Sequence, residues 1–82
     1  MRVRLRFFLA DLPGPSGLQE IEVREGATVG EALSAYLQDN PIEDPYHKLP
    51  ESMFLIGKQS AQLGSVLRDM DELTVMRILS GG

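Results

Sequence analysis

The two residues that end the sequence, Gly81 and Gly82, are the ones whose types and position could do chemistry. They follow residues 73–79, an apolar run typical of a β-strand. Glycine has no Cβ, so a tail of two glycines is thin and its backbone adopts almost any φ/ψ combination. Such a tail can enter a narrow tunnel in another protein and present its terminal carboxylate there. Taken alone, the dipeptide is also compatible with a frayed end, as most chain termini are.

The length of the chain limits what else it can contain. A sequence of 82 residues forms one domain with a thin core, too small for both a substrate cleft and a stable scaffold. No pair of residues has the types and spacing of an active site. These properties favour a carrier, a subunit or a binding module over a free-standing enzyme.

Composition excludes several further classes. The sequence has no cysteine and a single histidine, His47, so we expect neither a disulfide nor a metal site. The net charge of −4 repels phosphate backbones, which argues against nucleic-acid binding and favours a basic protein partner. No apolar run approaches the ~20 residues that span a bilayer, and no signal-peptide pattern opens the chain. We therefore expect a cytoplasmic protein that binds no membrane.

The first quarter of the chain alternates between apolar and polar residues, which is typical of half-buried strands. Residues 2–9 and 18–24 are the two alternating segments, and residues 11–17 between them form a dense turn signal, so the pair predicts a hairpin. In the first strand we expect Val3, Leu5, Phe7 and Leu9 to face inward and Arg2, Arg4, Arg6 and Phe8 outward. We expect the three arginines to pair with glutamates of the second strand. The alternative is that this row of arginines is a docking surface for a partner.

A helix is predicted from Thr28 to Asn40. Thr28 and Glu31 have the spacing of a capping box, in which the threonine accepts from the backbone and the glutamate reaches back. Proline disfavours helix in the residue before it, so Asn40-Pro41 ends the element. The residues expected on its buried face are Val29, Leu33, Tyr36 and Leu37.

The second half of the chain predicts an irregular loop and two further strands. Residues 40–52 contain three prolines and predict the loop. Residues 53–56 predict a short strand that a turn at Gly57-Lys58 closes, and residues 68–72 predict a polar turn before the last strand. We expect core contacts from Leu63, Val66 and Leu67 in the connecting stretch, and from Leu73 and Val75 in the last strand.

This order of elements predicts an α+β fold. One main helix would pack across a mixed four- to five-stranded sheet. If the first and last strands lie side by side in the centre, the fold is a ubiquitin-like β-grasp. Residues 1–79 would form the domain and residues 80–82 a flexible tail.

Several short segments together resemble the ubiquitin-like sulfur-carrier family of MoaD and ThiS. Residues 5–10 are similar to the start of the molybdopterin synthase small subunit, and residues 28–33 match the family's helix start. Residues 67–73 resemble its Leu-x-Asp-Gly-Asp-x-Val segment, with Met70 in place of the glycine, and the Gly-Gly end matches its terminus. Arg77-Ile78 stands where the molybdopterin subunit usually carries prolines.

The resemblance implies a carrier rather than an enzyme. In this family a ubiquitin-activating-like adenylyltransferase adenylates the terminal glycine, here Gly82, and a persulfide sulfur then displaces AMP to leave a thiocarboxylate. The ATP and Mg²⁺ belong to the activating enzyme, so no cofactor is expected on this chain. The second implied partner is the larger molybdopterin synthase subunit or another sulfur acceptor enzyme, in the pathway to the molybdenum or tungsten cofactor.

The same resemblance suggests roles for residues near the tail. Gly81 would give steric access, while Ser80 and Leu79 would line the mouth of the partner's tunnel. Strand alternation places Phe8 outward, with burial by the neighbouring strand or a loop as the alternative, and Met76 and Ile78 would join it in an apolar patch that binds the partner.

Three alternatives to this pathway remain open. The carrier could supply sulfur for thiamine, cysteine or tRNA thiolation. It could instead be a ubiquitin-like modifier joined to lysines through Gly82, or a β-grasp interaction module whose tail is inert.

Overall fold

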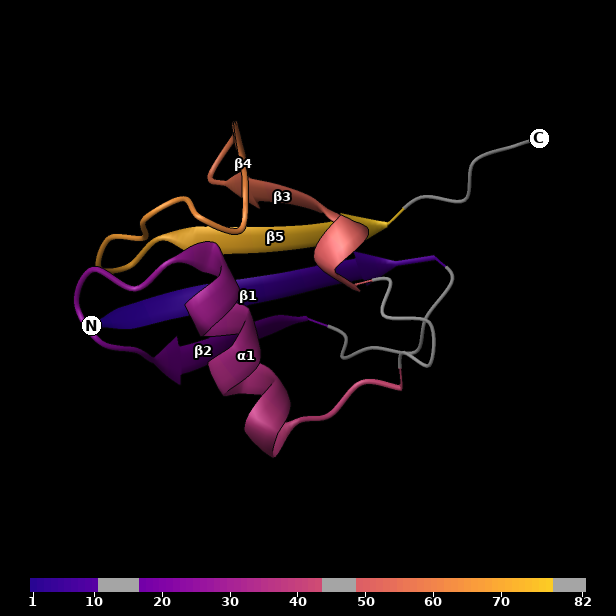
Figure 1. The fold of residues 1–82 in the computed structure, drawn as a ribbon, viewed down its shortest axis with the longest axis horizontal. Coiled ribbons are helices and arrows are strands. Elements are labelled where there is room, and N and C mark those ends of the chain that lie inside the picture. The colour runs from indigo at the N-terminus through magenta and orange to yellow at the C-terminus, as the bar shows by residue number, and fades with distance from the viewer. Residues whose placement is uncertain (11–16, 44–48, 78–82) are drawn as a thin grey trace.

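A computed structural model describes residues 1–10, 17–43 and 49–77 of the chain (Figure 1). In that part of the chain, two strands precede one long helix and three strands follow it. The elements are β1 (Arg2–Leu9), β2 (Leu18–Glu22), α1 (Val29–Asp39), the 3₁₀ helix η1 (Leu49–Glu51), β3 (Met53–Ile56), β4 (Gln59–Ala61) and β5 (Glu72–Arg77).

The strands form one mixed five-stranded sheet in the order β2-β1-β5-β3-β4. The first and last strands, β1 and β5, are parallel neighbours in its centre. The pairs β1–β2, β3–β4 and β3–β5 are antiparallel. The helix α1 crosses one face of the sheet (Figure 1). This arrangement confirms the predicted α+β, β-grasp fold.

The core lies between α1 and the inward face of the central strands. Leu5 of β1 and Leu73 of β5 are fully buried, as the alternation predicts. Phe7 and Tyr36 of α1 pack with their ring centroids 5.2 Å apart, which ties the helix to β1. The other buried members of the core are Val3, Val29, Ala32, Leu33, Leu49, Phe54, Leu67 and Val75.

The helix begins with the predicted capping residues, and its glutamate also binds an arginine that the prediction did not include. The Glu31 amide donates to the Thr28 hydroxyl at 3.2 Å, as in a capping box. The Glu31 carboxylate reaches back to the Thr28 hydroxyl, from which it accepts at 3.5 Å, and both of its oxygens also accept from the Arg24 guanidinium at the shorter distance of 2.7 Å. The hydrogen bond from Arg24 lowers the pKa of Glu31 from its ordinary value of 4.5. At the other end, the Asn40 amide donates to the Tyr36 carbonyl, which confirms the predicted end of the helix.

The stretch after β4 differs from the prediction. Leu67 is buried, but Leu63 and Val66 are 38% and 60% exposed. The reason lies in the backbone, because the carbonyls of Leu63 and Ser65 accept from the first amides of α1 at 2.9 Å each. With its main chain turned toward the helix start, this segment directs two apolar side chains outward.

Further differences concern the boundaries of elements. The predicted loop at 40–52 contains η1, whose Leu49 joins the core. The turn at Gly57 closes a β3–β4 hairpin, and its short second strand, β4, was not predicted separately. The last strand ends at Arg77, and the remainder of the predicted strand lies outside the described residues.

The turn before β5 contains a residue in a left-handed conformation. Met70 has a φ of +68°. It stands where the sulfur carriers resembled by the sequence have a glycine, and glycine is the residue that adopts such angles without strain. Its amide donates to the Arg2 carbonyl at 2.6 Å, and the Asp71 carboxylate accepts from the Arg68 amide at 2.8 Å. These bonds hold the turn against the start of β1 despite the missing glycine.

Candidate functional site

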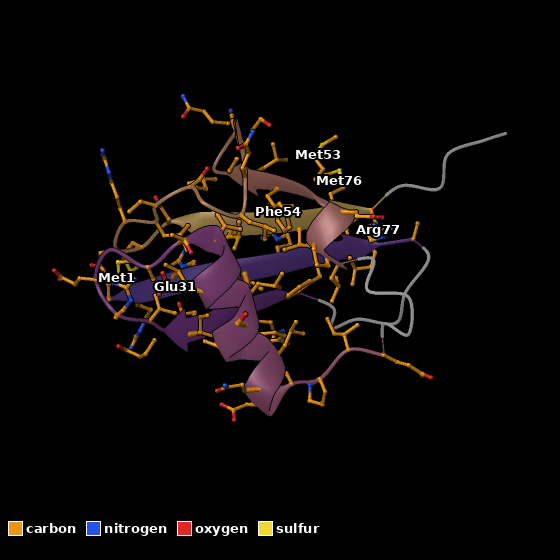
Figure 2. The ribbon with its side chains drawn as sticks, viewed as in Figure 1. Met1, Glu31, Met53, Phe54, Met76 and Arg77 are labelled. Atoms are coloured by element: carbon orange, nitrogen blue, oxygen red, sulfur yellow. The ribbon has the colours of Figure 1, made fainter. Side chains whose placement is uncertain are left out.

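The sheet face opposite α1 carries a row of apolar side chains across its three central strands. Phe8 of β1 is paired with Met76 of β5, and Met76 is paired with Met53 of β3. Paired residues of neighbouring strands lie on the same face. Phe8 is 51% and Met53 53% exposed, and Met76 is partly buried between them. We call these three residues the apolar strip; Figure 2 shows its two methionines side by side.

The apolar strip lies where the chain leaves the sheet. Met76 is the second-last residue of β5, which ends at Arg77. The predicted outward position of Phe8, and that of Met76 on the same face, are therefore confirmed. The other proposed site residues, Ile78, Leu79, Ser80, Gly81 and Gly82, lie outside the described residues, and their roles stay predictions.

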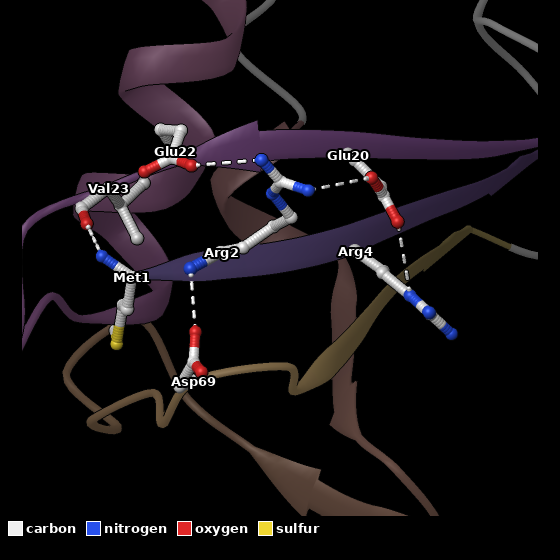
Figure 3. A network of polar contacts seen from close by, with 7 residues as sticks. All are labelled: Met1, Arg2, Arg4, Glu20, Glu22, Val23 and Asp69. Carbon is white, nitrogen blue, oxygen red and sulfur yellow. Dashed lines mark hydrogen bonds and ion pairs between the residues drawn. The ribbon is translucent and has the colours of Figure 1, made fainter.

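The opposite end of the same face is polar (Figure 3). The Arg2 guanidinium pairs with Glu22 at 3.2 Å and Glu20 at 3.9 Å, and Arg4 pairs with Glu20 at 3.5 Å. These contacts confirm the predicted pairing between the two strands of the hairpin. Exposed pairs of this kind contribute little stability each, so their main effect is to keep this end of the face hydrophilic.

Arg6 differs from the other two arginines. It lies opposite Leu18 in the β1–β2 register, so no glutamate of β2 faces it directly. Its guanidinium instead pairs with Glu72 of β5 at 3.5 Å. The outer face is thus divided into a paired polar region and the apolar strip, with the Arg6–Glu72 pair between them.

The acidic turn before β5 has structural roles. The Asp69 carboxylate accepts from the Arg2 amide at 2.8 Å, Asp71 accepts within the turn, and Glu72 pairs with Arg6. Within residues 1–10, 17–43 and 49–77, no group of three or more His, Cys, Asp or Glu side chains is arranged to hold a metal ion. No described helix is long and apolar enough to cross a bilayer.

Two hollows lie elsewhere on the described surface. An apolar groove lies between α1 and η1, where Leu37, Leu49 and Leu63 are among its lining residues. A polar hollow beside β4 includes Arg68 and Asp71. Neither hollow has a histidine or a cysteine among the described residues that line it.

Comparisons with known proteins identify the fold. No protein-family model matches the chain, and neither does any curated protein. The crystal structure of SAMP1 from Haloferax volcanii matches with a TM-score of 0.72 and 26% identity over 100% of both chains. The chain has the β-grasp fold of the SAMP and MoaD proteins.

Two molybdopterin-converting factors also match. One is a chain of the complex of subunits 1 and 2 from Helicobacter pylori 26695, with a TM-score of 0.63 and 22% identity over 100% of both chains. The other is the putative subunit 1 from Pyrococcus furiosus, with a TM-score of 0.62 and 18% identity over 95% of this chain and 98% of that one. These matches confirm, at the level of the fold, the resemblance inferred from short segments of the sequence.

Met53 is the member of the apolar strip that sequence reasoning did not identify. A signal was present, because strand alternation places Met53 opposite in direction to the buried Phe54. The register of β3 against β5 cannot be derived from the sequence pattern, and this register places Met53 rather than Leu55 beside Met76.

Proposed function

We propose that this chain is a sulfur carrier whose terminal Gly82 is converted to a thiocarboxylate and donates its sulfur in molybdopterin biosynthesis. The observation that carries the proposal is the position of the apolar strip beside the end of β5, the strand that leads to Gly81-Gly82. Likeness over the full length to subunit 1 of molybdopterin-converting factor supports the choice of pathway.

The chemistry needs an activated carboxylate. A free carboxylate is a poor electrophile because its charge is delocalised and it has no leaving group. Adenylation by a ubiquitin-activating-like enzyme joins the Gly82 carboxylate to AMP and releases pyrophosphate. The terminal sulfur of a persulfide then attacks the Gly82 carbonyl carbon and displaces AMP, which gives an acyl disulfide. A second thiol attacks the other sulfur of this bond, forms a disulfide with it and releases the thiocarboxylate. The carrier supplies the carbon and the docking surface, and the enzyme supplies ATP and Mg²⁺.

Geometry links the apolar strip to this chemistry. The residues 78–82 that follow β5 span at most about 17–18 Å, at ~3.3–3.6 Å per residue. A partner that takes Gly82 into its active site therefore also lies within that distance of Arg77, next to Met76. Exposed aromatic and methionine side chains are enriched in protein interfaces. The activating enzyme and the larger synthase subunit are the two partners that this surface would receive in turn.

A second candidate function is protein modification. The 26% identity to SAMP1, a small archaeal modifier protein, supports it. In this case a target lysine rather than a persulfide would attack the Gly82 adenylate or a thioester derived from it. Both candidates use the same tail and the same first partner, and they differ only in the nucleophile.

The test is the mass of the intact chain after incubation with an activating enzyme, ATP and a persulfide donor. A sulfur carrier exchanges one oxygen of Gly82 for sulfur, and the exchange is absent without ATP or after deletion of Gly81-Gly82. Fragmentation must place the change at Gly82, because methionine oxidation adds nearly the same mass. A branched peptide in which the Gly82 carboxyl is joined to a lysine would support the modifier instead. If target proteins are added to the incubation and a folded chain still gains neither product, both candidates are overturned.

A further inference from the structure

All the sulfur of this chain is in methionine. The sequence has four methionines and no cysteine, and all four lie in the described residues. Two of them, Met53 and Met76, are paired across β3 and β5 in the apolar strip. The other two lie at the far end of the sheet, where Met1 packs against the core and Met70 is in the turn before β5.

We propose that Met53 and Met76 form a reversible oxidation site, at which hydroperoxides convert the two thioethers to sulfoxides and so prevent docking on the apolar strip. This inference rests on the proposed function, because its consequence is the loss of partner binding. It assigns the two methionines a role beyond packing against the partner.

The reaction is a two-electron oxidation of sulfur. The thioether sulfur attacks one oxygen of the hydroperoxide, the oxygen–oxygen bond breaks, and a sulfur–oxygen bond forms. The second peroxide oxygen leaves as water, or as an alcohol if the peroxide is organic. Methionine sulfoxide reductases reverse the change at the expense of a thiol pair, so the site returns to its reduced form.

The position of the two side chains explains why oxidation would affect docking and not folding. Met53 is 53% exposed, and neither Met53 nor Met76 packs in the core cluster. A sulfoxide oxygen on Met53 is therefore solvated in the free chain. Once a partner covers the strip, the same oxygen is buried among apolar groups, where an unsatisfied acceptor is costly.

Phe8 and Arg6, which flank the strip along β1, do not offset this cost. Phe8, on the other side of Met76, has no hydrogen-bond donor in its side chain. The nearest arginine along β1, Arg6, lies two residues before Phe8 and is paired with Glu72 at 3.5 Å. Oxidation would thus convert an apolar surface into one that must lose water on docking.

Met70 provides a matched control. It is 50% exposed, close to the value for Met53, but it lies at the opposite end of β5 from Met76. Met70→Leu should load sulfur as the unsubstituted chain does, and should lose loading to the same extent after peroxide treatment. The test variant is the double substitution Met53→Leu and Met76→Leu, which keeps an apolar side chain at both positions.

The experiment treats the full chain alone with hydrogen peroxide, removes the peroxide, and then measures sulfur loading and the melting temperature. Peptide mapping assigns each sulfoxide. For each variant, the loading rate of the treated protein is divided by the loading rate of the untreated protein. We expect this ratio to be about 0.1 or lower for the unsubstituted chain and for Met70→Leu, as burial of an unsatisfied acceptor implies. It should stay near one for the double variant. The melting temperature should not change, and the two methionine sulfoxide reductases, one for each sulfoxide epimer, should together restore loading.

Other outcomes overturn the inference and can be told apart from failure of the proposed function. Full loading of a chain that carries sulfoxides at Met53 and Met76 removes the oxidation site while the carrier function stands. So does an equal loss in the double variant, or a fall in melting temperature that accompanies oxidation of these two residues. If the untreated chain is not loaded at all, the proposed function fails, and the inference fails with it.

Discussion

Met76 and Phe8 are opposite each other in the parallel pairing of β5 with β1, and one residue earlier on each strand Val75 and Phe7 are also opposite each other. The first pair lies on the outer face, where Phe8 is 51% exposed, whereas Val75 and Phe7 are 0% and 6% exposed. Two adjacent phenylalanines of one strand thus have different environments.

Replacement of these two phenylalanines should separate binding from stability. Phe8→Ala is expected to weaken binding of the activating enzyme by about 1–2 kcal/mol, the size typical of an interface anchor, and to change the melting temperature little. Phe7→Ala should cost about 3–5 kcal/mol of folding free energy because it empties part of the core. Calorimetric titration and urea unfolding measure the two effects. An unchanged affinity in Phe8→Ala would remove this residue from the interface.

Gly81→Val should stop sulfur loading without unfolding the domain. A β-branched side chain widens the tail and restricts its backbone, so the tail no longer fits a narrow tunnel. The measurement is the rate of sulfur gain by intact mass, alongside a circular dichroism melt. Gly64→Ala is a suitable control, because a Cβ at Gly64 meets nothing within 4 Å. Retained loading in Gly81→Val would contradict the steric role.

Met70→Gly is expected to be more stable than Met70→Ala by about 0.5–1 kcal/mol. A left-handed residue with a Cβ carries strain of about 1–2 kcal/mol, which glycine relieves, and the greater freedom of glycine in the unfolded chain offsets part of this gain. Comparison with alanine, which keeps the Cβ, isolates the backbone effect from loss of the methionine side chain. Urea unfolding of both variants measures the difference. Equal stability would show that a φ of +68° is not strained in this turn.

The Arg24–Glu31 pair should make a small part of the stability sensitive to acid. Its hydrogen bond lowers the pKa of Glu31 in the folded chain below the ordinary value of 4.5. Stability from a carboxylate with a lowered pKa is present above the unfolded value and is lost as the pH falls through the folded value. A carbon-13 NMR titration of the Glu31 carboxyl measures the shift. Arg24→Gln should return the titration toward its ordinary value, and an unaltered titration would show that Arg24 is not the cause.

Local sequence patterns predicted the strands and the helix because each pattern depends only on residues within its own element. Alternation in residues 2–9 correctly predicted that Phe7 faces inward and Phe8 outward, and the capping residue Thr28 correctly predicted the start of α1. Pairing between distant segments could not be predicted in this way. The partner of Arg6 depends on the β1–β5 register, which brings Glu72 within 3.5 Å.

The candidate site was predicted in part for the same reason. Phe8 and Met76 follow from alternation within their own strands, while the place of Met53 beside them depends on how β3 pairs with β5. Leu63 and Val66 were wrongly predicted as core residues because apolar composition suggested burial. In the structure, the backbone of their segment contacts the start of α1 through the Leu63 and Ser65 carbonyls.

The central position of β5 has a mechanical consequence. This strand is bonded to β1 on one side and to β3 on the other, along most of its length. Inter-strand hydrogen bonds run across the strand direction, so a force applied at Arg77 along β5 loads many of them together in shear. An edge strand pulled away from its neighbour would instead lose its bonds one after another. A protein-unfolding motor that pulled on the C-terminal glycines would therefore meet its greatest resistance at β5, the first strand that it reached.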